Sequence, residues 1–240
     1  MKIRWNKINR GLVLGALLLV GLVGFILFKN VQFQKEIPEI REGVKAYTDA
    51  LLALNMSPEG TEIGEPLTDP QKAQKMDQFD AMIAKYWASE SSDHYMNAEQ
   101  IRENYEDSLK FPQTVNMFHY DWEVLDKRIT VTEDGPDYAT VRMSIEGVTI
   151  ESQGCADSIF TTEHTKYGME IVYKPEGSVA GDVIVDGADA PEYDTGFYRC
   201  VYNGNLQFSM KREDGEWKIT GMVGMLWLRS MTEIEEVSGS

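Results

Sequence analysis

The chain of 240 residues has little of the chemistry that marks most enzymes, with two cysteines and three histidines. The histidines, His94, His119 and His164, are far apart in the chain, and none pairs with another at the spacing of metal ligands. The motifs H-E-x-x-H, C-x-x-C, G-x-S-x-G and G-x-G-x-x-G and the phosphate-binding P-loop are all absent. The sequence therefore predicts no catalytic residue, no metal site and no cofactor, and it favours a protein that is not an enzyme.

Basic residues are also scarce, since 23 Lys and Arg stand against 39 Asp and Glu, a net charge of −16. Residues 1–35 hold six of the basic residues and no acid, so residues 36–240 carry 17 basic and 39 acidic side chains, or −22. A charge step this sharp indicates that the two parts lie in different surroundings. We expect no binding of nucleic-acid phosphates, and partners that are neutral or basic.

One long apolar run lies between two basic clusters. Residues 11–28 contain no polar side chain, and as a helix they would span roughly 27 Å, close to the thickness of a bilayer core. The run ends in Phe28-Lys29, with neither the A-x-A pattern of a cleavage site nor a nearby cysteine for lipid attachment. We predict an uncleaved signal anchor over 11–28. The alternatives are a cleaved signal peptide and a buried globular helix.

Basic residues flank this anchor unequally. Four precede it: Lys2, Arg4, Lys7 and Arg10. Two follow it, Lys29 and Lys35. The positive-inside rule therefore predicts a single-pass protein of the cell membrane, with a cytoplasmic basic tail over 1–10 and an extracytoplasmic C-terminal part. Gly11 and Gly15 form a small-xxx-small pair that could seat a second copy of the helix, so a homo-oligomer is one expectation.

The part after the anchor divides into three regions. A juxtamembrane segment and a first helix are predicted over 29–57, an α+β domain over 58–230 that includes this helix in its fold, and a polar acidic tail over 231–240. Pro38 is placed to begin the helix, whose apolar residues over 37–54 recur every three or four positions. That stripe suits a helix packed on a sheet, or a short coiled coil growing from the membrane.

Two more helices are predicted from their boundary signals. A turn-rich linker over 56–69 precedes a helix that Asp69 would cap. Asn97, with Gln100 three residues later, has the pattern of a capping box, and Pro112 ends the helix that follows.

After Pro112 the apolar period changes from helical to two. Alternation predicts strands over 118–124, 141–146 and 167–173, and a long strand over 197–210 that is kinked at 203–205. A closing strand over 217–227 follows the turn signal Asp214-Gly215. Hairpin-linked strands make an antiparallel sheet, and the helices that precede it should cover one face. The predicted fold class is α+β.

This order of elements resembles the nuclear-transport-factor-2-like (cystatin-like) superfamily, in which three helices precede a strongly curved antiparallel sheet that forms a cone. The resemblance covers about residues 37–228. It rests on the element order and on the closing segment 214–222, DGEWKITGM, which looks like the last strand often seen there. It implies a curved sheet. Some members of the superfamily are isomerases or dehydratases with an Asp, Tyr or His inside the cone, and no such residue can be placed in this chain.

The combination of a short cytoplasmic tail, one span and one extracytoplasmic domain of this class has a second resemblance. It is similar to the bitopic assembly factors of type IV secretion and conjugation machines, which are non-enzymatic scaffolds that self-associate and hold other components. This resemblance implies a protein-binding or assembly module of a cell-envelope complex, with other envelope proteins as partners. The alternative is a membrane-tethered small-molecule-binding protein or isomerase-like enzyme that uses the interior of the cone.

Aromatic residues concentrate in the predicted sheet, where they either pack against the helices or line a pocket. The candidates for pocket lining are Tyr120, Trp122, Tyr167, Phe197, Phe208, Trp217 and Trp227.

The two cysteines, Cys155 and Cys200, both fall in the predicted extracytoplasmic part, where a disulfide is permitted. Closing a loop of roughly 45 residues would stabilise the domain by about 4 kcal/mol. The alternative is a pair of small buried residues that stay reduced.

Residues 176–194 hold six acidic residues and no basic one. Because their spacing does not match an EF-hand loop, we predict a solvated acidic loop rather than a calcium site.

Overall fold

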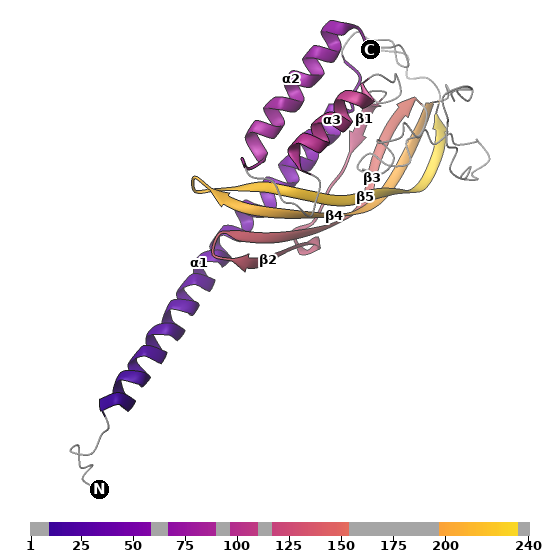
Figure 1. Cartoon of the computed structure of the whole chain (residues 1–240). Helices are drawn as coiled ribbons and strands as arrows, with labels where there is room; N and C mark the ends of the chain where they lie inside the picture. Colours follow the sequence, from indigo (N-terminus) through magenta and orange to yellow (C-terminus); the bar gives the residue numbers. More distant parts are fainter. Residues whose placement is uncertain (1–9, 59–66, 90–96, 110–116, 154–196, 235–240) are drawn as a thin grey trace, which may run out of the picture. The chain divides into compact units, whose positions relative to one another are not determined.

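The computed structural model of the chain describes residues 10–58, 67–89, 97–109, 117–153 and 197–234 (Figure 1). Its elements in chain order are α1 (Arg10–Leu54), α2 (Asp69–Tyr86), α3 (Ala98–Ser108), β1 (Met117–Asp121), the 3₁₀ helix η3 (Asp126–Arg128), β2 (Ile129–Gly135), β3 (Tyr138–Gln153), β4 (Phe197–Glu213) and β5 (Glu216–Ile234). The chain divides into two compact units, Met1–Ile40 and Arg41–Ser240. Helices followed by an antiparallel sheet confirm the predicted α+β class.

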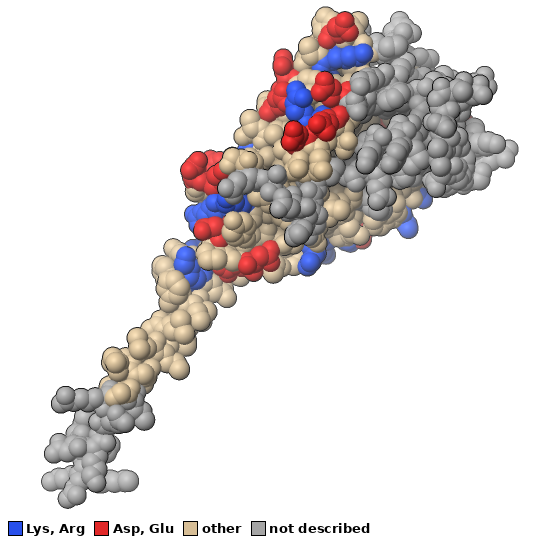
Figure 2. Space-filling model, in the orientation of Figure 1, with Lys and Arg blue, Asp and Glu red and all other residues tan. Residues whose placement is uncertain are grey.

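The first unit contains the predicted anchor within α1. This helix is long and apolar enough to cross a membrane, and residues 11–28 carry no charged side chain (Figure 2). Its apolar side chains are exposed, with Leu18 and Val20 each 68% accessible. A helix that exposes apolar side chains in this way suits a lipid environment, because apolar side chains are favourable against hydrocarbon and a helix satisfies its backbone groups internally over the apolar run 11–28. An apolar N-terminal helix that could anchor the protein is therefore present.

The anchor's flanking residues are only partly described. Lys2, Arg4 and Lys7 lie outside the described residues, whereas Arg10 begins α1 and Lys29 lies within it. Gly11 and Gly15 are also in α1, and a Cβ added to Gly15 would meet no atom within 4 Å. That open space would admit a neighbouring helix, and packing between two copies stays a prediction.

Pro38 lies inside α1. The prediction that a new helix begins at Pro38 is therefore wrong. A proline removes one backbone hydrogen bond from a helix interior. Residues 25–42 contain no glycine, which is the next most unfavourable residue in a helix interior, and the helix continues through the proline.

Capping boxes begin α2 and α3. Gln71 Oε1 accepts a hydrogen bond from the backbone N–H of Thr68 at 2.9 Å, so Thr68 is the cap of α2 and not Asp69 as predicted. Asp69 instead occupies the first turn, where a carboxylate suits the helix dipole. The predicted box at Asn97 is confirmed. Gln100 Oε1 accepts from the Asn97 N–H at 3.1 Å, and Asn97 Oδ1 accepts from the Gln100 N–H at 2.9 Å.

The described strands form one antiparallel sheet in the order β1-β3-β4-β5, with β2 also paired to β3. The long strands β3, β4 and β5 curve along their length (Figure 1). The predicted hairpin turn between β4 and β5 is confirmed, because Asp214 and Gly215 both have positive φ angles, 52° and 87°. Strand β5 continues to Ile234, four residues into the segment predicted as a tail over 231–240. The strand predicted over 167–173 lies outside the described residues.

The predicted kink at 203–205 in β4 is wrong. These residues pair in regular register with both β3 and β5. The extra residue is instead Gly147 on β3, where the pairing shifts between Glu146 and Val148. Gly147 has φ +75°, which a glycine adopts without strain, and its N–H donates to Asn203 Oδ1 at 3.1 Å. The amide-rich sequence of β4 therefore stabilises a bulge in its neighbour.

A second bulge changes which residues of β5 face the core. The pairing shifts by one residue between Ile219 and Gly221, which leaves Thr220 as the extra residue. After the bulge the even-numbered residues point to the buried side, so Leu226 is 1% exposed whereas Trp227 is 39% exposed. Simple alternation along 217–227 therefore places the second half of β5 on the wrong face.

The core of the second unit lies between the sheet and the helices, and Tyr47 of α1 is at its centre. The Tyr47 ring packs edge-on against Tyr86, Trp87 and Phe208, at centroid distances of 5.8, 6.1 and 6.0 Å. Its hydroxyl donates to Met222 Sδ at 3.3 Å. We call the sheet face that carries Phe208 and Met222 the inner face, and the opposite one the outer face.

A buried lysine joins the ends of the helices. Lys75 of α2 is 5% exposed, and its Nζ donates to the carbonyl oxygens of Leu54, at 3.1 Å, and Met56, at 2.6 Å, where α1 ends. The Tyr105 hydroxyl of α3 donates to the same Leu54 oxygen at 3.0 Å. Burial lowers the pKa of Lys75 to about 8. The lysine therefore supplies donors to an otherwise unpaired helix end, at the cost of holding a charge away from water.

This lysine predicts how stability depends on pH. Between about pH 8 and 10 the unfolded chain binds the Lys75 proton more tightly than the folded one, so the free energy of unfolding should rise with pH, by up to about 3 kcal/mol. Above pH 10 it should fall, because burial raises the pKa of Tyr47 and Tyr105 and only the unfolded tyrosines ionise. Urea unfolding at a series of pH values measures both limbs. In Lys75→Met the rise should be absent and the fall retained; an unchanged rise would assign the effect to another group.

Candidate functional site

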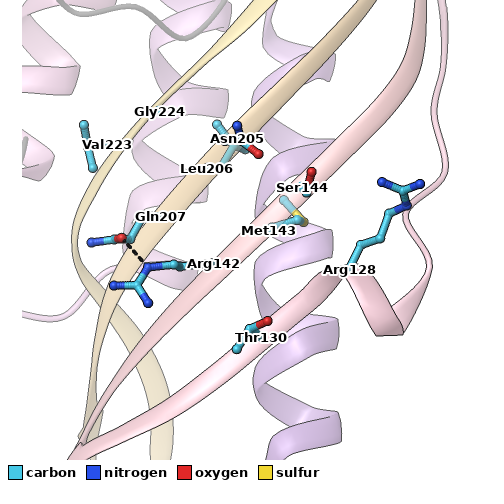
Figure 3. A pocket seen from close by; sticks show the side chains of 10 residues that line it. All are labelled: Arg128, Thr130, Arg142, Met143, Ser144, Asn205, Leu206, Gln207, Val223 and Gly224. Carbon is cyan, nitrogen blue, oxygen red and sulfur yellow. Dashed lines mark hydrogen bonds between the residues drawn. The ribbon is translucent and has the colours of Figure 1, made fainter.

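The outer face of the sheet carries a groove of about 340 Å³ (Figure 3). Its lining residues come from η3, β2, β3, β4 and β5: Arg128, Thr130, Arg142, Met143, Ser144, Asn205, Leu206, Gln207, Val223 and Gly224. Most of the polar members stand on the outward positions of their strands, while Met143 and Leu206 are buried beneath them. The groove therefore combines a polar wall with an apolar floor.

Strand register brings the polar residues together. Arg142 of β3 is paired with Thr130 of β2 on one side and with Gln207 of β4 on the other, and Gln207 is paired with Val223 of β5. These residues form one row across four strands, because directly paired residues point to the same face. Ser144 and Asn205 are paired in the next outward row, so that two rows of the sheet build the groove.

Arg142 is the main charged group of the groove. Its Nε donates to Gln207 Oε1 at 2.9 Å (Figure 3), which orients the planar guanidinium group. No hydrogen bond from its two terminal nitrogens, and no ion pair, is formed with any residue that the structure describes. An arginine with one edge held and the other open is prepared to bind a carboxylate or a carbonyl oxygen through two N–H groups.

The second arginine is in a different state. Arg128 Nη1 forms an ion pair with Glu146 Oε1, and both side chains are partly exposed. Its charge is therefore compensated by a neighbour on β3, and it borders the groove as a paired residue. Arg142 is therefore the groove arginine that forms no ion pair with a described residue. It lies in residues 36–240, whose net charge is −22.

The described lining residues carry neutral groups that suit the binding of a polar ligand. The hydroxyls of Thr130 and Ser144 and the amides of Asn205 and Gln207 can donate and accept hydrogen bonds. The described lining residues include no Asp, Glu, His, Cys, Lys or Tyr, which are the usual general acids, bases and nucleophiles. A groove of this kind can hold a peptide or another ligand rich in carbonyl oxygens.

Six of the seven predicted lining aromatics are described by the structure; none of these six borders the groove, and they are distributed over both faces of the sheet. Phe208 is fully buried in the core on the inner face, and Trp217 is half-buried. Phe197 packs edge-on against Phe118 at a centroid distance of 6.0 Å, and its strand neighbour Tyr198 faces the core. Trp227 is exposed on the outer face because of the bulge in β5. Tyr167 lies outside the described residues.

The remaining two aromatics meet at a residue that the sequence did not single out. The Tyr120 hydroxyl and the Trp122 indole N–H both donate to Asp49 Oδ1 of α1, at 3.2 and 3.0 Å. Burial, and then the Asp49 charge, raise the pKa of the Tyr120 hydroxyl, so it stays protonated and remains a donor. Asp49 therefore ties α1 to β1, which is a structural role.

Sequence reasoning missed the groove residues for a definite reason. Arg142 and Ser144 fall within the alternating strand predicted over 141–146, and Gln207 falls within the strand predicted over 197–210. The register between two strands decides which of their polar residues are neighbours. Register in turn depends on bulges such as that at Gly147. Only the folded sheet shows that Arg142 and Gln207 are partners.

Other candidates concern residues that the structure does not describe. Cys200 is fully buried in β4, but Cys155 lies outside the described residues, so the disulfide stays a prediction. His94, His164 and the acidic loop over 176–194 also lie outside them.

Comparison with known proteins identifies no family. No protein-family model matches the chain, and a search of curated proteins finds no match. The structure is similar to the crystal structure of a proposed aromatic ring hydroxylase from Novosphingobium aromaticivorans, with a TM-score of 0.35 and 14% identity, over 68% of this chain and 82% of that one. A similarity at this level concerns the course of the chain and assigns no activity.

Proposed function

We propose that this chain is a non-enzymatic, single-pass membrane protein whose second unit binds other proteins of the cell envelope through the outer face of its sheet. The observation that carries the proposal is the groove around Arg142, whose described lining has an oriented guanidinium group, several neutral hydrogen-bonding groups and no acid-base residue. The exposed apolar helix before it supports attachment to a membrane. The resemblance to assembly factors of secretion and conjugation machines extends the proposal to an assembly role.

The alternative, an enzyme that uses the inner side of the sheet, has less support. Such a site needs polar groups that face a shared space and are free to react. Three of the buried polar side chains described there are engaged in the fold. The Thr48 hydroxyl donates to the Val44 carbonyl at 2.8 Å, Lys75 to two carbonyls at the end of α1, and Tyr47 to Met222 Sδ. Each of these contacts has a structural purpose.

Photocrosslinking in membranes tests the proposal directly. A photoreactive amino acid at Thr130, on the rim of the groove, should crosslink the full chain to a second protein species in membranes of its host. The same group at Asp77, an exposed position of α2, serves as the matched control and should give no such product. Adding Arg142→Ala to the Thr130 probe should reduce the product by about tenfold, as expected for the loss of a bidentate pair.

The outcome of this experiment is decisive in either direction. A product of defined mass that depends on Arg142 supports protein binding at the groove. A chain that stays monomeric under crosslinking, or a product of equal yield with Arg142→Ala, would contradict it. Circular dichroism of Arg142→Ala is the check on folding, and because this side chain is exposed the spectrum should be unchanged.

A further inference from the structure

Strand β5 contains a regular stretch between two bulges. The first bulge is at Thr220, and the second leaves Arg229 as the extra residue, because Leu228 and Ser230 pair with consecutive residues of β4. Between them, residues 221–228 pair without interruption with residues 202–209. We call residues 221–228 the edge segment. Its length and regularity are those of a strand that can accept a further neighbour.

Among the described residues, the edge segment has a pairing partner on one side only. On its other side, the nearest described pairing is at Ile219, which forms a parallel bridge with Trp87 and accepts a hydrogen bond from the Ala88 N–H at 2.8 Å. Past this point no described residue pairs with β5 except those of β4. A strand in this position presents a row of backbone N–H and C=O groups that another strand can satisfy.

The usual protection of an edge strand is missing from this segment. Natural edges carry Lys, Pro or inward-pointing charges that prevent pairing with other chains. The edge segment reads GMVGMLWL, without a charge or a proline, in a chain that is 26% charged. Val223 and Trp227 are 45% and 39% exposed beside it on the outer face. An apolar, unprotected edge in a protein this acidic indicates an edge that is used.

Charge decides between the candidate occupants. A second copy would bring two parts of −22 each edge to edge, and their repulsion opposes a stable pair. A partner with basic residues would be attracted to the same surroundings, and its paired residues must be apolar or neutral to match the edge segment. The opposite edges of the sheet, β1 and β2, are shorter, with 5 and 7 residues.

We propose that the edge segment binds an extended strand of a partner protein, apolar or neutral over the paired residues and flanked by Lys or Arg, which adds to the sheet beside β5. This inference rests on the proposed function, that the domain binds proteins, and it names the chemistry of the partner. Because Val223 and Gly224 also line the groove, the added strand lies along the groove, and its outward side chains extend the row formed by Arg142, Gln207 and Val223.

Amide hydrogen exchange of the full chain in detergent micelles tests this pairing. The probe is an alternating Thr-Val peptide of matching length with two lysines at each end. It should slow exchange of amides in 221–228 by about tenfold, while amides of α2 are unchanged. The matched peptide that is N-methylated at alternate residues cannot complete the ladder and should give no protection, and the peptide with glutamates at its ends should bind at least about tenfold more weakly.

Two protein variants complete the test. Trp227→Lys places a charge beside the edge and should abolish the protection, whereas Tyr138→Lys, at another exposed outward aromatic of the sheet, should retain it. Unchanged exchange in 221–228 with the lysine-flanked peptide, or equal protection by the N-methylated one, would overturn the proposal. The proposal would also be overturned if amides in 221–228 exchanged slowly without peptide and the particle had the mass of two chains. That result would mean that a second copy of the chain pairs with the edge segment. If crosslinking depended on Arg142 but amide exchange in 221–228 stayed unchanged, the proposed pairing at the edge segment would be wrong and the proposed function would still stand.

Discussion

Replacing Tyr47 by alanine is expected to lower the free energy of unfolding of the domain by about 4 kcal/mol. The Tyr47 side chain is fully buried, and its ring is surrounded by Tyr86, Trp87 and Phe208 within 6.1 Å between centroids. These neighbours come from α2, the residue that follows it and β4, so they cannot all move to fill the space. The loss therefore combines the removed apolar contact with an unfilled cavity.

The conservative variant separates packing from hydrogen bonding. Tyr47→Phe keeps the ring and removes only the hydroxyl, which donates to Met222 Sδ, so its loss should be about 1 kcal/mol or less. Urea unfolding followed by tryptophan fluorescence measures both variants. If Tyr47→Ala and Tyr47→Phe lost equal stability, the ring would not be the centre of the core.

Replacing Gly224 by alanine should cost about 3 kcal/mol, at the upper end of the range for overpacking. A Cβ at this position would meet the carbonyl oxygen of Asn205, and would lie 2.7 Å from Leu206 Cδ2 and 2.8 Å from Leu206 Cα. Two of these three atoms belong to the backbone of β4, so a change of side-chain rotamer cannot relieve the contact. Strands β4 and β5 would have to separate at the groove and at the edge segment together.

Two other glycines serve as controls for Gly224→Ala. Gly43→Ala lies in α1, where a Cβ meets no atom within 4 Å, and it should stabilise the domain by about 0.5–1 kcal/mol. Gly147→Ala also has open space but a φ of +75°, and should cost about 1 kcal/mol. Thermal or urea unfolding of the three variants measures the order. A loss at Gly224 no larger than that at Gly147 would show that the two strands can separate without penalty.

Sequence signals predicted correctly those structural features that depend on a few neighbouring residues. The apolar run over 11–28, the capping box at Asn97 and the turn at Asp214-Gly215 were predictable, because each depends on residues within one or two turns of chain. The α+β class followed in the same way from the change of period after Pro112. The predicted helix start at Pro38 and the predicted helix cap at Asp69 were wrong. A residue's propensity is a weak preference, and it was outweighed by the surrounding helix at Pro38 and by the neighbouring Thr68 at Asp69.

The candidate site depended on information that no local pattern contains. A single extra residue, Thr220, reverses the faces of the second half of β5, so Trp227 leaves the core and Leu226 enters it. Arg142 and Gln207 meet only because β3 and β4 pair in one register, across a long interval of chain.

The sequence by itself determined an acidic α+β protein with one apolar N-terminal helix, because composition and periodicity are properties of the chain alone. The tertiary structure decided where the groove lies and which strand forms an edge of the sheet among the described residues. The physical reason is that a bulge shifts every later residue to the opposite face, and its position is chosen by hydrogen bonds between strands that are far apart in the sequence.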